Sequence, residues 1–188
     1  MIVALAIGLA LGIQAFVIKP YQIPSASMLP TLIEGERVLV NRLGTHFGDP
    51  GVGDIVVFNP PEGADRGKQC GVDRKASEPC PEPTPEKSDT NFIKRVVAGP
   101  GDRLRVEDGI PVVNGEPVDD PDWNVRNCGS APECNLRDEI EIPADHYFMM
   151  GDNRGASDDS RFWGPVPEEW IIGKSFLTYW PPGEWGLF

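Results

Sequence analysis

The hydrophobic and polar positions of the chain follow two different patterns, and the change comes near residue 18. Residues 2–18 carry no charge, and Gln14 is their one strongly polar side chain. As a helix this run is about 25 Å long at ~1.5 Å per residue, slightly short of a ~30 Å hydrocarbon core. We predict an N-terminal transmembrane anchor over residues 1–18 and a separate domain over residues 19–188.

A cleaved signal peptide is the alternative interpretation of the apolar run. The small residues Ser25, Ala26 and Ser27 resemble a cleavage site. However, no basic stretch precedes the apolar run, and Pro24 is awkward immediately upstream of the small residues. These two features favour a retained anchor.

Short strands are predicted along the rest of the chain. The strand-like stretches lie around Val38 and Val40 and over residues 53–58, 92–97 and 173–180. Asn114-Gly115 is a strong signal for a two-residue hairpin turn. The chain has 21 glycines and 20 prolines, and no long segment with a 3.6-residue period follows residue 18. These features favour a single, mainly β domain.

Residues 60–90 have a different composition from the strand-like stretches. They include six prolines, seven acidic and five basic residues, and Val72 is their one large aliphatic side chain. Such a segment buries too little apolar surface to offset its ordering entropy. We predict a surface excursion of the domain and not a second domain.

The charge balance excludes one class of partner. The formal net charge is −12 at pH 7, and no cluster of lysine and arginine offers a local exception. A chain of this charge repels polyanions, so we expect no nucleic-acid partner.

The four cysteines fall as two local pairs, Cys70 with Cys80 and Cys128 with Cys134. Short loops favour disulfides within each pair, although this pairing is one of three connectivities. A zinc site needs more ligands nearby, and the two histidines of the chain are distant in sequence from both pairs. Disulfides indicate that the domain lies outside a reducing cytosol.

The basic residues give a conflicting signal for orientation. Lys19, Arg37 and Arg42 follow the apolar run, so a literal positive-inside count places the domain in the cytoplasm. Large domains can translocate regardless of charge, so we give more weight to the cysteine pairs, which indicate a location outside the cytosol. We expect a single-pass protein of the cell membrane with its domain on the extracytoplasmic side.

A candidate nucleophile lies in residues 23–32, which read IPSASMLPTL. Pro24 and Pro30 restrict the backbone, so Ser25 and Ser27 lie on a stiffened, non-helical stretch. A serine hydroxyl is a weak nucleophile until a base takes its proton. The candidate bases are the two histidines, His46 and His146, and the lysines.

Four sequence blocks occur in a distinctive order, with a C-x5-C pair between the last two. They are IPSASMLPTL at 23–32, GDIVVF at 53–58, FIKRVVAGPGD at 92–102 and GDNRGASDDSRFWG at 151–164. Together with the apolar anchor, this order resembles the type I signal peptidases, the membrane-anchored Ser-Lys endopeptidases that release exported proteins from their signal peptides. The resemblance implies an antiparallel β-sheet catalytic domain of the signal-peptidase and LexA-like fold.

The resemblance also implies roles for individual residues. Ser27 is the expected nucleophile and Lys94 the general base. Ser25 matches the position whose hydroxyl joins the backbone N–H of Ser27 in the oxyanion hole. Ser157 matches the serine that orients the lysine amine.

The last block is expected to support the site structurally, through Gly151, Asp152, Asp159 and Arg161. By the resemblance, Asp159 and Arg161 form an ion pair and Gly151 leaves room beside the lysine. In this chain Gly155 and Ala156 replace the acidic and amide residues of many relatives. This departure puts side-chain contacts from those two positions in doubt.

Lys94 needs a special environment to act as a base. A lysine with its reference pKa of ~10.4 is neutral only about one time in a thousand near pH 7.4. Lowering that pKa by ~3 units takes a penalty of ~4 kcal/mol against the ammonium form, which burial can supply. Strand alternation points Lys94, Phe92 and Val96 to one face and Arg95 to the other.

By the resemblance, shallow apolar substrate pockets are expected, lined in part by Ile23, Pro24, Met28, Leu32, Phe92 and Ile93. Such walls admit small residues at the first and third positions before the cut, the Ala-X-Ala preference. The signal-peptide end is expected to add as a strand beside these segments. Core packing is the alternative role for these residues, and for Leu32 the two roles are equally supported. Trp180 and Trp185 suit either the lipid headgroup level or the core.

No metal or cofactor is expected. Asp152, Asn153, Asp158 and Asp159 suggest a calcium loop, but Arg154 occupies the third position of that count. The expected partners are signal peptides of exported preproteins and membrane lipid, and we expect a monomer.

Three alternatives to a Ser-Lys signal peptidase remain open. The first is a Ser-His hydrolase that uses Ser27 and His146. The second is a self-cleaving repressor of the LexA type, which needs a DNA-binding segment and a cytosolic location that this chain does not indicate. The third is an anchored extracytoplasmic binding module, an inactive relative in which Ser27 and Lys94 lack catalytic geometry.

Overall fold

The structure is a computed structural model that describes residues 17–42, 48–65, 70–118, 128 and 131–187. Most of the predicted anchor, residues 1–16, lies outside the described residues. Within the described ranges, no helix is long and apolar enough to cross a membrane. The first strand of the described residues begins at Ile18, and the predicted boundary between anchor and domain stays a prediction.

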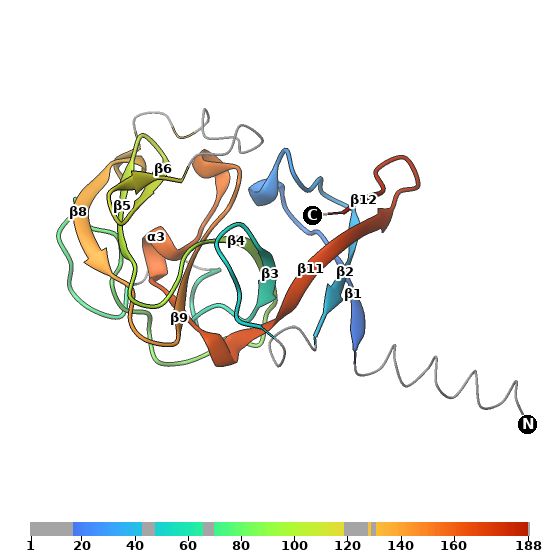
Figure 1. The fold of residues 1–188 in the computed structure, drawn as a ribbon, viewed down its shortest axis with the longest axis horizontal. Coiled ribbons are helices and arrows are strands. Elements are labelled where there is room, and N and C mark those ends of the chain that lie inside the picture. Colours follow the sequence, from blue (N-terminus) through green and yellow to red (C-terminus); the bar gives the residue numbers. More distant parts are fainter. Residues whose placement is uncertain (1–16, 43–47, 66–69, 119–127, 129–130, 188) are drawn as a thin grey trace, which may run out of the picture.

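Eight strands form a large sheet in the order β1–β2–β11–β3–β4–β9–β10, with β12 paired to β11 (Figure 1). The strands are β1 (Ile18–Gln22), β2 (Arg37–Asn41), β3 (Ile55–Phe58), β4 (Phe92–Ala98), β9 (His146–Met150), β10 (Val166–Pro167), β11 (Ile171–Trp180) and β12 (Gly186–Leu187). Every pairing described in this sheet is antiparallel. Figure 1 shows β1, β2 and β11 as a ribbon at one end of the molecule.

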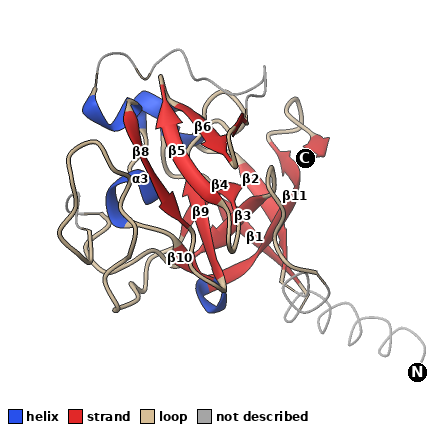
Figure 2. Cartoon of the chain, turned by 60° about the vertical axis from the view of Figure 1, so that its left-hand side comes forward, coloured by secondary structure: helices blue, strands red, loops and turns tan. Residues whose placement is uncertain are grey.

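A second, smaller antiparallel sheet has the order β7–β6–β5–β8 and lies at the other end of the molecule (Figure 1). Its strands are β5 (Arg103–Glu107), β6 (Ile110–Val113), β7 (Glu116–Pro117) and β8 (Leu136–Glu141). The helical elements of the described residues are short: η1 (Ala26–Met28), η3 (Pro132–Cys134), η4 (Arg154–Ala156), α3 (Ser160–Trp163) and η5 (Glu168–Trp170). Strands therefore dominate the fold (Figure 2), which confirms the mainly β prediction.

The predicted hairpin turn is present between β6 and β7. Asn114 and Gly115 have φ angles of 53° and 88°, the left-handed pair that a type I′ turn requires. A turn of the same kind, Asp108-Gly109, joins β5 to β6 and was not predicted. Strand β8 was also missed, because its polar sequence LRDEIE hides two inward positions, Leu136 and Ile140.

The hydrophobic core has three parts, and strand β4 contributes to each of them. On one face Val96 packs in the same cluster as Trp163 of α3. The end of β4 packs with Leu104 and its neighbours in the smaller sheet. On the other face Ile93 packs with Met28 of the predicted nucleophile segment. Strand β4 therefore joins the two sheets to the segment that carries the predicted nucleophile.

The described parts of the predicted excursion, 60–65 and 70–90, lie against α3 with little strand pairing of their own. A disulfide joins Cys70 to Cys80, which confirms the predicted pairing. Cys80 is buried, and its backbone N–H donates to the carbonyl of Arg161 at 3.3 Å. The excursion is therefore fastened to the helix that carries Arg161.

Gly173 of β11 lies where two strands approach closely. A Cβ atom added there would lie 2.3 Å from the carbonyl oxygen of Asn41 and 3.0 Å from Cγ1 of Val40 in β2. The added methyl group would push the backbone of β2 away from β11 and strain their pairing. We therefore expect Gly173→Ala to lower the free energy of unfolding by about 1–3 kcal/mol. Thermal denaturation should show a Tm lower by roughly 3–10 °C.

The matched control is Gly183→Ala, where an added Cβ would meet nothing within 4 Å. Its Tm should stay near that of the unchanged chain. Equal melting temperatures for the two variants would contradict the close approach of β11 and β2.

Candidate active site

The predicted nucleophile, Ser27, lies in the turn η1, which follows β1 after a short extended stretch. The side chains of Met28 and Leu32 are 0% exposed and fix this turn to the core. The N–H of Leu32 also donates to the carbonyl of Met28 at 2.9 Å. Ser27 itself is 7% exposed, so its hydroxyl is held in a largely desolvated position.

The predicted base, Lys94, comes from the middle of β4. It is 4% exposed, and its Nζ lies 5.5 Å from the centroid of the Phe92 ring on the same strand face. A hydrogen bond of 2.6 Å joins Lys94 Nζ to Ser27 Oγ. Arg95, the next residue, forms its contacts with another part of the chain. The fold thus brings together two residues that are 67 positions apart.

Burial gives Lys94 the electrostatic property that a base needs. Desolvation disfavours the ammonium form and lowers the pKa of Lys94 from 10.5 to about 8. The carboxylates of Asp159 and Asp158 act in the opposite direction, and the Arg161 guanidinium again lowers the pKa. With this pKa about a fifth of the lysine is neutral near pH 7.4, against roughly one part in a thousand at the reference value.

Ser25 lies beside the nucleophile. It occupies the N-cap position of η1 with extended backbone angles, φ −148° and ψ 163°. Its Oγ donates to Ser27 Oγ at 3.3 Å. The two hydroxyls are therefore adjacent at the start of the turn, as a shared oxyanion hole requires. The role of Ser25 in that hole stays a prediction.

The loop after β9 holds the nucleophile turn through Asn153, a contact that the sequence analysis missed. The backbone N–H of Asn153 donates to the carbonyl of Ser27 at 3.0 Å. Its side-chain Nδ2 donates to the carbonyl of Ala26 at 3.0 Å. No local pattern in the sequence indicates that these carbonyls need donors from a residue 127 positions away.

Asp152 makes a second connection between the same segments. Its buried carboxylate accepts hydrogen bonds from Arg95 Nε at 2.9 Å and from Arg95 Nη2 at 2.6 Å. Thr31 Oγ1 donates to the same carboxylate at 2.5 Å. Asp152 therefore links the lysine strand to the end of the nucleophile segment, and neither Arg95 nor Thr31 was predicted to take part.

Gly151 sits where an added Cβ would collide with two groups of the site. That atom would lie 2.2 Å from Ser157 Oγ and 2.5 Å from the carbonyl oxygen of Ser27. Ser157 is buried, but its Oγ forms no hydrogen bond within the part of the chain that the structure describes. The predicted bond from Ser157 to Lys94 is thus not formed here, and the lysine amine is bonded to Ser27. The orienting role of Ser157 stays a prediction.

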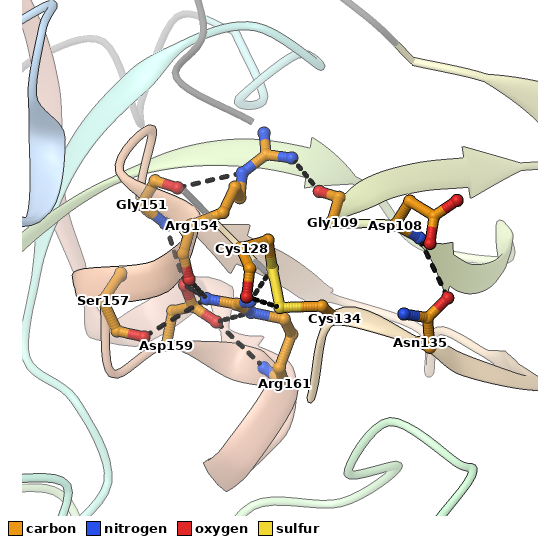
Figure 3. The surroundings of a disulfide bond; sticks show 10 residues. All are labelled: Asp108, Gly109, Cys128, Cys134, Asn135, Gly151, Arg154, Ser157, Asp159 and Arg161. Atoms are coloured by element: carbon orange, nitrogen blue, oxygen red, sulfur yellow. Dashed lines mark hydrogen bonds and ion pairs between the residues drawn. A yellow bond between two sulfur atoms is a disulfide. The ribbon is translucent and has the colours of Figure 1, made fainter. Parts of the chain in front are cut away.

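Asp159 and Arg161 form a fully buried ion pair beneath the loop (Figure 3). Arg161 Nε lies 2.8 Å from Asp159 Oδ1, and Arg161 Nη2 also donates to the carbonyls of Arg154 and Ser157. Burial raises the pKa of Asp159, but the charge and hydrogen bonds of Arg161, the Gly151 N–H and the Lys94 charge together lower it below its ordinary value, so the carboxyl stays ionised. Asp159 also accepts the backbone N–H of Gly151 at 3.0 Å, which fixes the end of β9 beside the nucleophile.

A disulfide joins Cys128 to Cys134 next to this ion pair, as predicted from the sequence (Figure 3). Arg161 Nη1 donates to Cys128 Sγ at 3.6 Å. The buried side chain of Arg154 crosses to the smaller sheet, where its Nη1 donates to the carbonyl of Gly109. The loop that holds the site is therefore fastened to both sheets.

A groove of about 180 Å³ lies against the ends of β1 and β3 and the start of β4, and neither Ser27 nor Lys94 is among its lining residues. It is lined by Tyr21, Gln22, Ile23, Pro24, Val57, Asn91, Phe92 and Ile93. Four of the six predicted pocket residues are among them. Met28 and Leu32 lie instead in the core with Ile23, because the turn needs their side chains as anchors. A substrate contact from Met28 or Leu32 stays a prediction.

The histidines form no described contact with the nucleophile. His46 lies outside the described residues. His146 begins β9, and its Nδ1 is hydrogen-bonded to the carbonyl of Ala144 at 2.7 Å. Among the described side chains, no group of three or more His, Cys, Asp and Glu is arranged to hold a metal ion.

The burial of Lys94 predicts how folding stability depends on pH. Between the folded pKa of about 8 and the ordinary value of 10.5, the unfolded chain binds more protons, so stability rises with pH. Lys94→Met removes this dependence. We expect the variant to be more stable than the unchanged chain at pH 7 by on the order of 1–3 kcal/mol, and the gain to shrink toward pH 10.

Denaturant unfolding at pH 7 and pH 10 measures this difference. Lys87→Met, at an exposed lysine, is the control and should show the same small effect at both values. An equal stability gain for Lys94→Met at pH 7 and pH 10 would contradict this prediction. It would show that the folded state does not disfavour the ammonium form of Lys94.

Comparison with known proteins places this geometry in a family. The family model described as "Signal peptidase, peptidase S26" matches residues 1–180. "Probable signal peptidase I-1" of Synechocystis sp. is 37% identical over 186 residues, which cover 96% of this chain and 81% of the relative. "Signal peptidase I" of Leptolyngbya laminosa is 36% identical, over 98% of this chain and 79% of the relative. "Signal peptidase IB" of Staphylococcus aureus strain Mu50 is 30% identical, over 97% and 88%. The chain belongs to the signal peptidase family, peptidase S26.

Proposed function

We propose that this chain is a membrane-bound serine endopeptidase that removes N-terminal signal peptides from exported preproteins. The observation that carries the mechanism is the 2.6 Å hydrogen bond between the buried Lys94 Nζ and Ser27 Oγ. An inactive binding module has no support from the family match or from relatives that cover nearly the whole chain.

In the first half of the reaction the neutral amine of Lys94 takes the proton of the Ser27 hydroxyl. The Oγ atom attacks the carbonyl carbon of the scissile peptide bond, and the electron pair of the carbonyl moves onto its oxygen. The Ser27 N–H and the Ser25 hydroxyl are the donors assigned to that oxyanion. The Lys94 ammonium then protonates the leaving amine, which departs as the new N-terminus of the mature protein.

In the second half, water hydrolyses the acyl-enzyme. Lys94, neutral again after the first half, takes a proton from the water that attacks the ester carbon. Collapse of the second tetrahedral intermediate releases the signal peptide and returns the proton to Ser27 Oγ. Burial of the amine suits both halves, because it keeps the pKa of Lys94 near the pH at which the proton must move each way.

The groove suits an extended peptide with small side chains. Ile23 and Pro24, which precede Ser27 in the chain, and Phe92 and Ile93, which precede Lys94, are among the residues that line it. These segments present strand-like backbone, to which a substrate can add by backbone hydrogen bonds. The volume of about 180 Å³ favours Ala-type residues before the cut over large ones.

Exposed apolar residues support a position of the site close to lipid. Trp185 and Leu187 are 70% and 80% exposed, and Trp180 is 49% exposed. In the strand register, Arg37 of β2 pairs with both Gln22 and Trp180. The exposed tryptophans thus lie at the ribbon end that leads into the nucleophile turn. Indole rings favour the headgroup level, so we orient this end toward the bilayer. The two disulfides support an extracytoplasmic position of the domain at the cell membrane.

Cleavage of a preprotein tests the proposed function. We expect the full chain in detergent to release a mature protein whose new N-terminus, mapped by mass spectrometry, follows an Ala-X-Ala type sequence. Ser27→Ala and Lys94→Ala should each abolish cleavage, because one lacks the attacking oxygen and the other its base. His146→Ala is the control and should stay active. An active Lys94→Ala variant would refute the dyad, and an unchanged preprotein with the folded chain would refute the function.

The pH dependence of cleavage should follow the ionisation of Lys94. The neutral amine is the active form, so kcat/KM should rise with pH through a midpoint near 8 and level off above it. Well below the midpoint the rate should fall about tenfold for each pH unit. Initial rates with a fluorogenic signal-peptide substrate from pH 6 to pH 10 measure this. A flat profile between pH 7 and pH 9 would contradict the assignment of Lys94 as the base.

A further inference from the structure

The peptide unit between Ala26 and Ser27 is held on its carbonyl side by two donors. Asn153 Nδ2 donates to the Ala26 carbonyl at 3.0 Å, and the N–H of Leu29 donates to the same oxygen at 3.2 Å. The next carbonyl, that of Ser27, accepts the backbone N–H of Asn153 at 3.0 Å. Asn153 is 5% exposed, so both of these bonds lie in a largely desolvated place.

The geometry of a peptide bond links these contacts to the other edge of the same unit. In a planar trans peptide the C=O and the N–H point in opposite directions. A donor that fixes the Ala26 oxygen therefore also fixes the direction of the Ser27 N–H. Hydrogen bonds to the carbonyl polarise the amide and strengthen its N–H as a donor. Within the described residues, the Ser27 N–H has no acceptor that would compete for it.

We propose that Asn153 is a positioning residue of the oxyanion hole. Its side-chain amide orients and polarises the Ala26–Ser27 peptide, so that the Ser27 N–H points at the substrate oxygen as that oxygen gains charge. Asn153 itself transfers no proton and does not touch the substrate. This inference rests on the proposed function, in which Ser27 attacks a peptide carbonyl.

Several bonds other than those of the Asn153 side chain hold its loop in place. Asp152 ties the loop to Arg95 and to Thr31, and the backbone N–H of Asn153 ties it to Ser27. Asp159 fixes Gly151, two residues before Asn153, by accepting its backbone N–H. All of these bonds survive truncation of the Asn153 side chain. Truncation removes the bond from Nδ2 and leaves the Ala26 carbonyl with the N–H of Leu29 as a donor.

The test uses the full chain with two substitutions, Asn153→Ala and Asn153→Asp. The first removes the donor, and the second keeps the shape but replaces the donor with an acceptor. Loss of a direct oxyanion donor lowers kcat by about 100- to 1,000-fold, and a residue that acts through the donor should matter less. We expect kcat to fall about 10- to 50-fold, with KM within about threefold of the unchanged chain. The midpoint of the pH profile should not move in Asn153→Ala, which adds no charge near Lys94; in Asn153→Asp the new carboxylate should raise it.

A tetrahedral adduct gives a readout that a merely structural role would not move. A peptide aldehyde with a signal-peptide C-terminus adds to Ser27 and places an oxygen in the oxyanion position, whereas the matching peptide alcohol does not react. We expect both Asn153 variants to lose affinity for the aldehyde by about the same factor as kcat and to keep their affinity for the alcohol.

Thr31→Val is the matched control, because it removes one hydrogen bond between the same two segments without touching the Ala26 carbonyl. It should lower the melting temperature as the Asn153 variants do, while the ratio of aldehyde to alcohol affinity stays unchanged.

Three outcomes would overturn the inference. In the first, both Asn153 variants keep kcat within about threefold. In the second, kcat of Asn153→Ala falls together with a shifted pH midpoint and an equal loss of aldehyde and alcohol affinity, which is the signature of a loosened site. In the third, the unchanged chain does not cleave a preprotein at all, which refutes the proposed function and the inference with it. The wild-type reaction separates this last case from the first two.

Discussion

The site depends on keeping one amine out of water. Lys94 is buried with its Nζ over the ring of Phe92, and this burial lowers its pKa to about 8. The buried carboxylate of Asp159 acts against this shift, because its negative charge favours the ammonium form and raises the pKa of Lys94. Arg161 counters it by pairing with Asp159 and by disfavouring a second positive charge. The ion pair therefore supports the base electrostatically as well as holding the loop.

A buried ion pair is costly unless its remaining polar atoms are satisfied. Around Arg161 the fold meets this requirement with backbone carbonyls and with a sulfur atom of a disulfide. The carbonyls of Arg154 and Ser157 accept from the guanidinium, and the Cys128 sulfur lies within 3.6 Å of it. Cys80, in the other disulfide, donates its N–H to the carbonyl of Arg161. Both disulfides thus converge on the residue that stabilises Asp159.

The sequence carries the local parts of this arrangement and not the long-range ones. The turn at Asn114 and the apolar surroundings of Lys94 could be predicted, because turn chemistry and strand alternation depend on neighbouring residues. Asn153 could not, since its role comes from two carbonyls that are distant in the chain. Met28 was expected in a substrate pocket but lies in the core. The sequence does not distinguish the two, because an apolar residue beside a nucleophile suits either a pocket wall or the core. The pairing of Ser27 with Lys94 came from the family resemblance, not from spacing.

The nucleophile turn has only three residues, too few to be rigid alone. Its rigidity comes from three sources that do not depend on one another. Pro24 and Pro30 restrict the backbone on either side, Met28 anchors the turn from below, and Asn153 fixes its carbonyls from across the site. The prolines set the path of the chain into and out of the turn. Met28 fixes the position of the turn on the core, and Asn153 fixes the orientation of the peptide planes on both sides of Ser27. A short turn can therefore hold a reactive serine without a long helix, because the sheet and the distant loop supply the order that the turn lacks.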